Sequence, residues 1–325
     1  MDYVQLGLRG PRVSRIAFGN WSSGGDWGGV DRPAAIATAR QALDLGITFF
    51  DTARAYGFGA AEELLGEALR PELRSRRDEL VIATKGGLRR DGDGQLVRDS
   101  SAGALRRDLE ASLRFLDTDY VDVYQVHWPD PATPFSETAE ALDESVRDGK
   151  VRYVGVSNYD ARQMAAFQQA RPLDALQPPY HLFRREIETS ILPFTAEHGI
   201  GVLVYGPMAH GLLGGRMTED TTFGPGDWRA SSDLFRGETF HRNLRIVSEL
   251  EAFAAERGTT VAQLAIAWTL ANPAVHVAIV GGRTPEQISA TAPAVDLHLT
   301  AEELGRIAEI TRDEVPVGGP SPESV

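Results

Sequence analysis

The chain contains no cysteine among its 325 residues, so it can form no disulfide, no thiolate metal site and no cysteine nucleophile. It is also short of positive charge, with 33 Lys and Arg against 46 Asp and Glu and a formal net charge of −13. So acidic a chain argues against nucleic acid and anionic membranes as partners. A phosphate-bearing ligand would therefore need its own basic pocket or helix N-terminus.

Long apolar runs are missing as well. No segment approaches the roughly 18 consecutive apolar residues that cross a bilayer. The opening MDYVQLGLRG lacks a basic start followed by an apolar stretch, so no signal peptide is expected. Together with the absence of cysteine, these features predict a cytoplasmic protein. The hydrophobic content of 42% and the charged content of 24% are ordinary for a globular chain.

What the chain has is a repeated alternation of short apolar runs with longer segments of helical period. Eight such pairs follow one another, from RIAFGN with RPAAIATARQALDLG to AVHVAIVGG with TPEQISATA. Such runs, bounded by turn residues, predict buried parallel strands joined by helices. A doubly wound open sheet is the rival, but no G-x-G-x-x-G follows the first run, and eight units match a closed barrel.

We therefore expect an α/β fold, with one (β/α)8 TIM-barrel domain over residues 1–325 and a mobile tail from about residue 314. Two segments interrupt the alternation: SSGGDWGGV after the first predicted strand, and a long Gly-, Asp- and Trp-containing segment after the seventh. Both follow the C-terminal ends of strands, where barrel active sites are built. The active site is expected at that face.

Polar side chains end three successive predicted strands. Because strand side chains alternate, Asp51, Lys85 and His127 each end an inward-facing row, and Tyr56 follows Asp51 in the next loop. Each residue alone is ordinary, as a turn former, a solvent-reaching lysine, a structural histidine or a turn tyrosine. Because all four are expected to face one space, a joint role is favoured.

The four side chains suit proton donation. Tyrosine has a pKa of about 10, and a nearby ammonium such as Lys85 is expected to lower the pKa of Tyr56. Asp51 would hold Lys85 and balance its charge, while His127 would hydrogen-bond a substrate carbonyl or relay the proton. A Schiff-base lyase with Lys85 as nucleophile is disfavoured, since an ion-paired lysine stays charged. No metal-ligand spacing is present.

Five segments, in order, resemble the aldo-keto reductase superfamily: DTARAYGFGAAEELLG, ATKGG, VYQVHWPD, GKVRYVGVSN and LVYGPMAHGLLGG. The resemblance runs from about Val4 to the C-terminal helices. It implies a barrel that binds NADP(H) without a Rossmann domain and reduces an aldehyde or ketone. It further implies that Tyr56 is the general acid, that Lys85 and Asp51 tune it, and that His127 orients the substrate.

The same resemblance implies the cofactor contacts. NADPH is expected, with NADH less favoured, and no metal. Arg283 and Thr284 precede a helix that opens at Pro285, a place where a guanidinium and free N–H groups can bind a 2′-phosphate. Ala290 and Thr291 depart from the Glu-Asn that the family often has there. The cofactor contacts that the resemblance implies are Gly19, Asn20, Trp21, Asp51, Ser157, Asn158, Gln177, Tyr205, Gly206, Pro207, Met208, Gly211, Leu213, Arg216, Gly281, Gly282, Arg283, Thr284 and Gln287.

Tryptophans are expected around the substrate. Trp21, Trp27 and Trp128 fall on the catalytic face beside Tyr56 and His127, and Trp228 in the long insertion could close over them. Aromatic walls favour apolar or aryl carbonyls. A second class of function is an NADP(H)-binding regulatory subunit of the potassium-channel β type, with little turnover. The substrate, the direction of reaction and the choice between monomer and homo-oligomer stay open.

Overall fold

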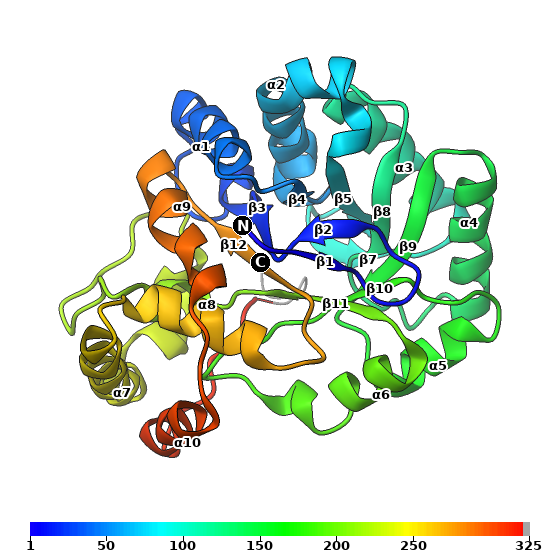
Figure 1. Cartoon of the computed structure of the whole chain (residues 1–325). Coiled ribbons are helices and arrows are strands. Elements are labelled where there is room, and N and C mark those ends of the chain that lie inside the picture. Colours follow the sequence, from blue (N-terminus) through cyan, green and yellow to red (C-terminus); the bar gives the residue numbers. More distant parts are fainter. Residues whose placement is uncertain (321–325) are drawn as a thin grey trace.

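The computed structural model describes residues 1–320 and confirms the predicted (β/α)8 barrel (Figure 1). Over these residues, eight parallel strands close in the order β10-β11-β12-β3-β4-β5-β8-β9. The closing pair joins β12 to β3, with Gly281 opposite Gly19. The barrel strands are β3 (Ile16–Gly19), β4 (Phe49–Asp51), β5 (Val81–Gly86), β8 (Val121–Val126), β9 (Val151–Ser157), β10 (Ala175–Gln177), β11 (Gly201–Tyr205) and β12 (Val277–Gly281).

Helices surround the barrel as a ring, as Figure 1 shows. They follow the segments of helical period, and several begin at a side-chain cap, such as Asp160, which forms a capping box with Gln163. None of the helices in residues 1–320 is long and apolar enough to cross a membrane. The helices are α1 (Arg32–Asp44), α2 (Ala60–Ser75), α3 (Ala102–Leu116), α4 (Phe135–Arg147), α5 (Ala161–Gln168), α6 (Ile191–His198), α7 (Gly237–Glu256), α8 (Val261–Ala271), α9 (Pro285–Thr291) and α10 (Ala301–Ile310).

The interior of the barrel is apolar at one end and polar at the other. An antiparallel hairpin of β1 (Tyr3–Gln5) and β2 (Arg12–Ser14) lies across the N-terminal end of the barrel. Leu6 from this hairpin joins Phe49, Val123 and other inward-facing side chains in a buried apolar cluster. Towards the C-terminal ends of the strands the buried inward residues become Asp51, Lys85, Gln125 and Gln177. The polar groups therefore gather at the predicted functional face.

Loops at that face carry additional structure. A short hairpin of β6 (Leu88–Arg90) and β7 (Leu96–Arg98) follows β5. The long insertion after β11 folds into 3-10 turns, including Trp228–Ser231 and Asp233–Phe235. These segments lie over the barrel mouth and shape the site described next.

The C-terminal segment packs against the barrel up to residue 320. The Asn243 side chain exchanges two hydrogen bonds with the backbone of Val315. The Val317 side chain is buried, and its backbone N–H donates to the Phe183 carbonyl at 3.0 Å. Residues 321–325, which belong to the predicted mobile tail, lie outside the described residues. Mobility of the tail from about residue 314 stays a prediction.

Candidate active site

Asp51, Lys85, Tyr56 and His127 come together at the C-terminal end of the barrel. Lys85 Nζ lies 2.7 Å from Asp51 Oδ2, 2.9 Å from the Thr52 carbonyl oxygen and 3.4 Å from the Tyr56 hydroxyl. The His127 ring meets the Tyr56 ring edge to face, with centroids 5.6 Å apart. The predicted residues thus form a connected cluster, in which the Lys85 ammonium joins Asp51 to the Tyr56 hydroxyl and His127 packs on the Tyr56 ring.

Strand order explains this convergence. Strands β4, β5 and β8 are neighbours, with Asp51 opposite Ala83 and Lys85 opposite Gln125. His127 follows β8 directly, and its backbone N–H donates to the Gly86 carbonyl at 2.9 Å. Parallel register therefore brings residues far apart in the sequence to the same edge of the sheet.

The turn that carries Tyr56 has an unusual backbone. Gly57 and Phe58 both have positive φ, at 60° and 51°. A Cβ on Gly57 would lie 2.7 Å from the Gly24 carbonyl oxygen, so the loop after β3 packs directly on this turn. Glycine is needed here for both conformation and space, and the turn places the phenol over Lys85.

The pKa of Tyr56 differs from the sequence prediction. Burial, then the charge of Asp51, then the charge of Asp26 raise the pKa of Tyr56 well above 10. The prediction that Lys85 lowers the pKa of Tyr56 is therefore wrong in its net direction. The loss of water around the phenol raises this pKa by more than the Lys85 ammonium can lower it. Tyr56 is consequently a protonated phenol at neutral pH, the form that can donate a proton.

The charges around Tyr56 are largely compensated. Burial lowers the pKa of Lys85, while the ion pair with Asp51 opposes that shift. Asp51 Oδ1 also accepts a hydrogen bond from Gln177 Nε2 at 2.8 Å. Burial, then the charge of Lys85, lower the pKa of His127 well below 6.5, so the ring is neutral at pH 7. A neutral imidazole can donate one hydrogen bond without adding charge.

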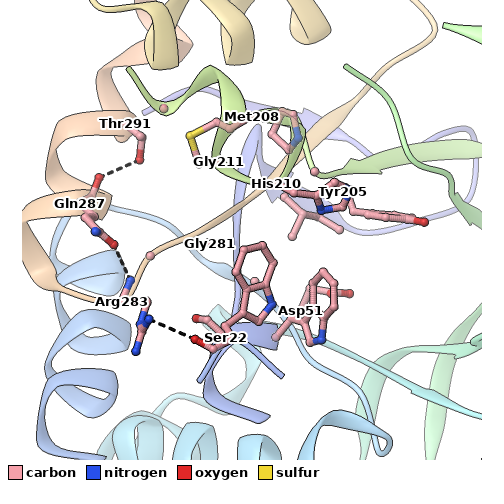
Figure 2. A pocket seen from close by; sticks show the side chains of 18 of the residues that line it. Ser22, Asp51, Tyr205, Met208, His210, Gly211, Gly281, Arg283, Gln287 and Thr291 are labelled. Carbon is pink, nitrogen blue, oxygen red and sulfur yellow. Dashed lines mark hydrogen bonds between the residues drawn. The ribbon is translucent and has the colours of Figure 1, made fainter. Parts of the chain in front are cut away.

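A cavity of about 800 Å³ extends from this cluster along the mouth of the barrel. In Figure 2, Asp51 and Tyr205 lie on one side of it, and Arg283, Gln287 and Thr291 on the other. Its walls include most of the predicted contacts: Gly19, Trp21, Trp27, Asp51, Tyr56, His127, Trp128, Ser157, Asn158, Gln177, Tyr205, Gly206, Pro207, Met208, Gly211, Arg216, Gly281, Gly282, Arg283 and Gln287. Its elongated run of polar and aromatic groups fits a dinucleotide.

Four predicted residues do not line this cavity among the described residues: Asn20, Lys85, Leu213 and Thr284. Lys85 contacts Asp51 and Tyr56, both of which do line it. Asn20 is buried, and its side-chain amide donates to the Ala61 carbonyl at 2.8 Å. Asn20 therefore ties the end of β3 to helix α2.

The predicted nicotinamide end is pre-arranged by internal hydrogen bonds. The Ser157 hydroxyl donates to the Gln177 carbonyl at 2.8 Å, and Asn158 Nδ2 donates to the His127 carbonyl at 3.0 Å. The Tyr205 hydroxyl donates to Asn158 Oδ1 at 2.9 Å. Asn158 adopts a positive φ of 63°, a strained conformation that is often found at functional sites.

The opposite end of the cavity is held by contacts between loops. Arg283 donates to the carbonyl oxygens of Trp27 at 3.2 Å and Gly29 at 2.8 Å. Its backbone N–H donates to Gln287 Oε1 at 2.7 Å, one of the bonds drawn in Figure 2. Ala290 and Thr291, which depart from the family pattern, also line this end.

Tryptophans do gather beside Tyr56. Trp21 stacks on Tyr56 with ring centroids 6.2 Å apart and meets Trp27 edge to face at 5.0 Å. Trp228 from the long insertion lies 6.4 Å from Trp21 and 6.1 Å from Trp27. Trp21, Trp27 and Trp228 thus pack together beside Tyr56, and a role of the tryptophans in substrate selection stays a prediction.

Several cavity residues are absent from the sequence prediction. Leu88 and Leu96 reach the wall from the β6–β7 hairpin, whose turn DGDG is a recognisable hairpin signal in the sequence. Asp26 and His210 line it from two segments that the sequence places at the catalytic face, and Pro320 lines it from the C-terminal segment. In residues 1–320 no group of three or more His, Asp or Glu is arranged to hold a metal ion.

Comparison with known proteins agrees with this geometry. The family model "Aldo/keto reductase family" matches residues 15–312. An aldo-keto reductase of Bacillus subtilis is 41% identical over 98% of this chain and 96% of its own length. The solved structure of the glycerol dehydrogenase from Gluconobacter oxydans superposes with a TM-score of 0.87 at 38% identity, covering 98% of this chain and 97% of that one.

Relatives with other printed names also match. The NADH-specific methylglyoxal reductase of Escherichia coli is 33% identical, over 92% of this chain and 95% of its own length. A probable voltage-gated potassium channel subunit beta of Arabidopsis thaliana is 36% identical, over 97% of this chain and 98% of its own length. Since the family model and these relatives span nearly the whole barrel, the chain belongs to the aldo/keto reductase family.

Proposed function

We propose that this protein is an NADPH-dependent oxidoreductase that reduces an aldehyde or ketone to an alcohol. The observation that carries the proposal is the Asp51–Lys85–Tyr56–His127 cluster opening onto one end of a long cavity. The reaction adds a hydride to the carbonyl carbon and a proton to the carbonyl oxygen. The nicotinamide cofactor, when bound, supplies the hydride.

Tyr56 is the proposed proton donor. Its raised pKa keeps the phenol protonated until the carbonyl oxygen gains negative charge. Lys85, 3.4 Å away, then lies close enough to stabilise the phenolate that forms. The charge of Asp51 holds Lys85 in that position at 2.7 Å. The pair thus acts on the product of proton transfer rather than on the resting phenol.

His127 is proposed to orient the substrate. Its Nδ1 is buried and has no partner among the described residues, and its pKa keeps the ring neutral. A neutral ring next to Tyr56 can direct the carbonyl oxygen towards the phenol by hydrogen bonding. The neutral ring adds no second positive charge beside Lys85. Such a charge would disfavour the protonated, ammonium form of Lys85.

The cofactor assignment rests on the two ends of the cavity. Ser157, Asn158 and Gln177 are proposed to bind the nicotinamide amide, and Tyr205 to stack on its ring, since all four line the cavity beside Asp51. A preference for NADPH is proposed because Arg283 offers a guanidinium at the far end. A relative that is named NADH-specific makes this preference a question for measurement.

A carbonyl panel tests the proposed function. NADPH consumption is followed with aldehydes and ketones of different size, and with NADH in place of NADPH. The proposal expects turnover that depends on the carbonyl compound, with NADPH preferred. Absence of turnover with every carbonyl, at saturating cofactor, would contradict it.

The second candidate is a cofactor-binding regulatory subunit. It is supported by the similarity to a probable potassium channel subunit beta over nearly the whole chain. Tight NADPH binding, negligible steady-state turnover and capture of an integral membrane partner would together favour it. A cytoplasmic location fits both candidates and stays a prediction.

A further inference from the structure

We propose that Asp26 makes this site selective for uncharged, hydroxyl-bearing carbonyl compounds over phosphorylated or carboxylated ones. The inference rests on the proposed carbonyl reduction and deepens it by naming the substrate class. Asp26 lies in the loop SSGGDWGGV between β3 and α1, and its side chain lines the cavity. No family motif quoted above includes this residue.

The Asp26 carboxylate is held in place. Its Oδ2 accepts a hydrogen bond from Trp21 Nε1 at 2.9 Å. Its backbone carbonyl accepts from the Trp228 N–H at 3.3 Å, and the next residue, Trp27, pairs with Asp227 of the long insertion. The loop is therefore held by Trp21 and by the long insertion, and the Asp26 carboxylate has a defined position beside Trp21.

The Asp26 carboxylate lies close to Tyr56, the proposed proton donor. Trp21, which donates to Asp26, stacks directly on the Tyr56 ring at 6.2 Å. After burial and Asp51, the charge of Asp26 is the next cause that raises the pKa of Tyr56. The carboxylate therefore acts electrostatically on the place where the substrate oxygen would sit.

The negative charge of Asp26 has no cationic partner in residues 1–320, where the Trp21 indole is its one side-chain donor. By contrast, Asp51 is paired with Lys85 at 2.7 Å. Arg229, which also lines the cavity, is bound by Asp227 at 2.6 Å. An anionic substrate would thus meet an uncompensated carboxylate beside the proposed proton donor.

Arg229, whose guanidinium carbon lies 4.6 Å from the Trp27 ring centroid, is already paired with Asp227. Trp27, Leu88, Leu96 and Trp128 present mostly apolar surface. A hydroxyl group on the carbon next to the carbonyl, however, could donate to the free Oδ1 of Asp26, since an ionised carboxylate only accepts hydrogen bonds. The same group therefore attracts a hydroxylated carbonyl and repels a phosphorylated one.

Glyceraldehyde and glyceraldehyde 3-phosphate form a matched pair of probes. The wild-type protein should show a higher kcat/KM for glyceraldehyde. Asp26→Asn keeps an oxygen that can accept from Trp21 but removes the charge. It should reduce the preference about tenfold, mainly through a higher kcat/KM for the phosphate ester, as expected for one unit charge several ångströms away.

The control is Asp44→Asn, which removes the same charge from the exposed end of α1, at the opposite face of the barrel. It should leave the preference unchanged. If Asp26→Asn does not fold, higher ionic strength should raise kcat/KM of the wild-type protein for the phosphate ester selectively.

An unchanged preference in folded Asp26→Asn, or a wild-type preference for the phosphate ester, would overturn the role of Asp26 while leaving carbonyl reduction intact. If the protein reduces neither probe and no other carbonyl compound, that result would overturn the proposed function and this inference with it.

Discussion

At the end of the cavity where we propose catalysis, Asp51 and Lys85 stand on neighbouring strands. At the far end, by contrast, Arg283 stands on a loop that reaches across to the loop after β3. Asp51 and Lys85 are buried, and strand register places them 2.7 Å apart. Arg283 is exposed, and it joins the loop after β3 through the carbonyls of Trp27 and Gly29. The first arrangement is fixed by the sheet, and the second by a few hydrogen bonds.

This difference suggests that one end of the cavity determines turnover and that the other determines the affinity for the cofactor. Groups on strand ends are preorganised, because moving them would break the sheet, and preorganised dipoles and charges are what lower a reaction barrier. Groups on loops can rearrange when a ligand binds. We therefore expect substitutions at the catalytic end to change turnover, and substitutions at the far end to change mainly binding.

The largest effect is expected from Lys85→Met. Removal of the ammonium should lower kcat about a thousandfold, because the phenolate of Tyr56 loses its partner. It should also lower the free energy of unfolding by roughly 3–5 kcal/mol, because Asp51 would be left buried without a cation. Steady-state kinetics and urea denaturation measure the two effects separately.

The double variant Asp51→Asn/Lys85→Met provides the control, since it removes both charges. It should recover most of the stability without recovering activity. Recovery of both, or a single Lys85→Met variant as stable as the wild type, would show that this ion pair does not organise the catalytic end.

The next effect concerns pH and stability. Burial lowers the pKa of His127 and His181 well below 6.5, that of His210 to about 3 and that of His276 below its usual value. The folded protein then binds fewer protons than the unfolded chain. Stability is therefore fully present above about pH 6.5 and is lost as the pH falls towards the folded pKa values. The expected loss is roughly 1.4 kcal/mol per pH unit for each histidine.

Urea denaturation at pH 7, 6 and 5 measures this loss. His210→Asn at the rim should reduce the slope, because one of the four histidines with a lowered pKa no longer contributes. An unfolding free energy that stays constant from pH 7 to pH 5 would contradict the neutral, buried state of these rings.

A smaller and more selective effect is expected from Arg283→Ala at the far end. If its guanidinium binds the 2′-phosphate, Kd for NADPH should rise about tenfold while Kd for NADH changes little. kcat at saturating cofactor should stay near the wild-type value. Arg236→Ala, which removes an exposed cation from the long insertion, is the matched control. Equal weakening of both cofactors would assign Arg283 to loop bridging instead.

The sequence was sufficient to predict the barrel and the convergence of Asp51, Lys85 and His127. Alternation of apolar runs with helical segments is a local signal, and period 2 in the strands put Asp51, Lys85 and His127 on the inner face. Parallel neighbours in a barrel then place such residues together without further information. The predicted cluster therefore followed from pattern and topology.

The rest depended on contacts between distant loops. The bonds of Arg283 to the loop after β3 span more than 250 residues of sequence, and the position of Asp26 depends on Trp21 and on the long insertion. The direction of the pKa shift at Tyr56 was mispredicted because the effect of burial cannot be judged before packing is known. Loop conformation and burial are thus the two quantities that the sequence alone did not give.

The most direct test of the central claim is turnover of Tyr56→Phe. The variant removes one hydroxyl group and keeps the ring that stacks on Trp21. Single-turnover NADPH oxidation with a carbonyl substrate measures the chemical step, and tryptophan fluorescence measures cofactor affinity. We predict a loss of at least about a thousandfold in the rate of NADPH oxidation, with Kd for NADPH nearly unchanged. A rate within a few fold of wild type would contradict the role of Tyr56 as proton donor.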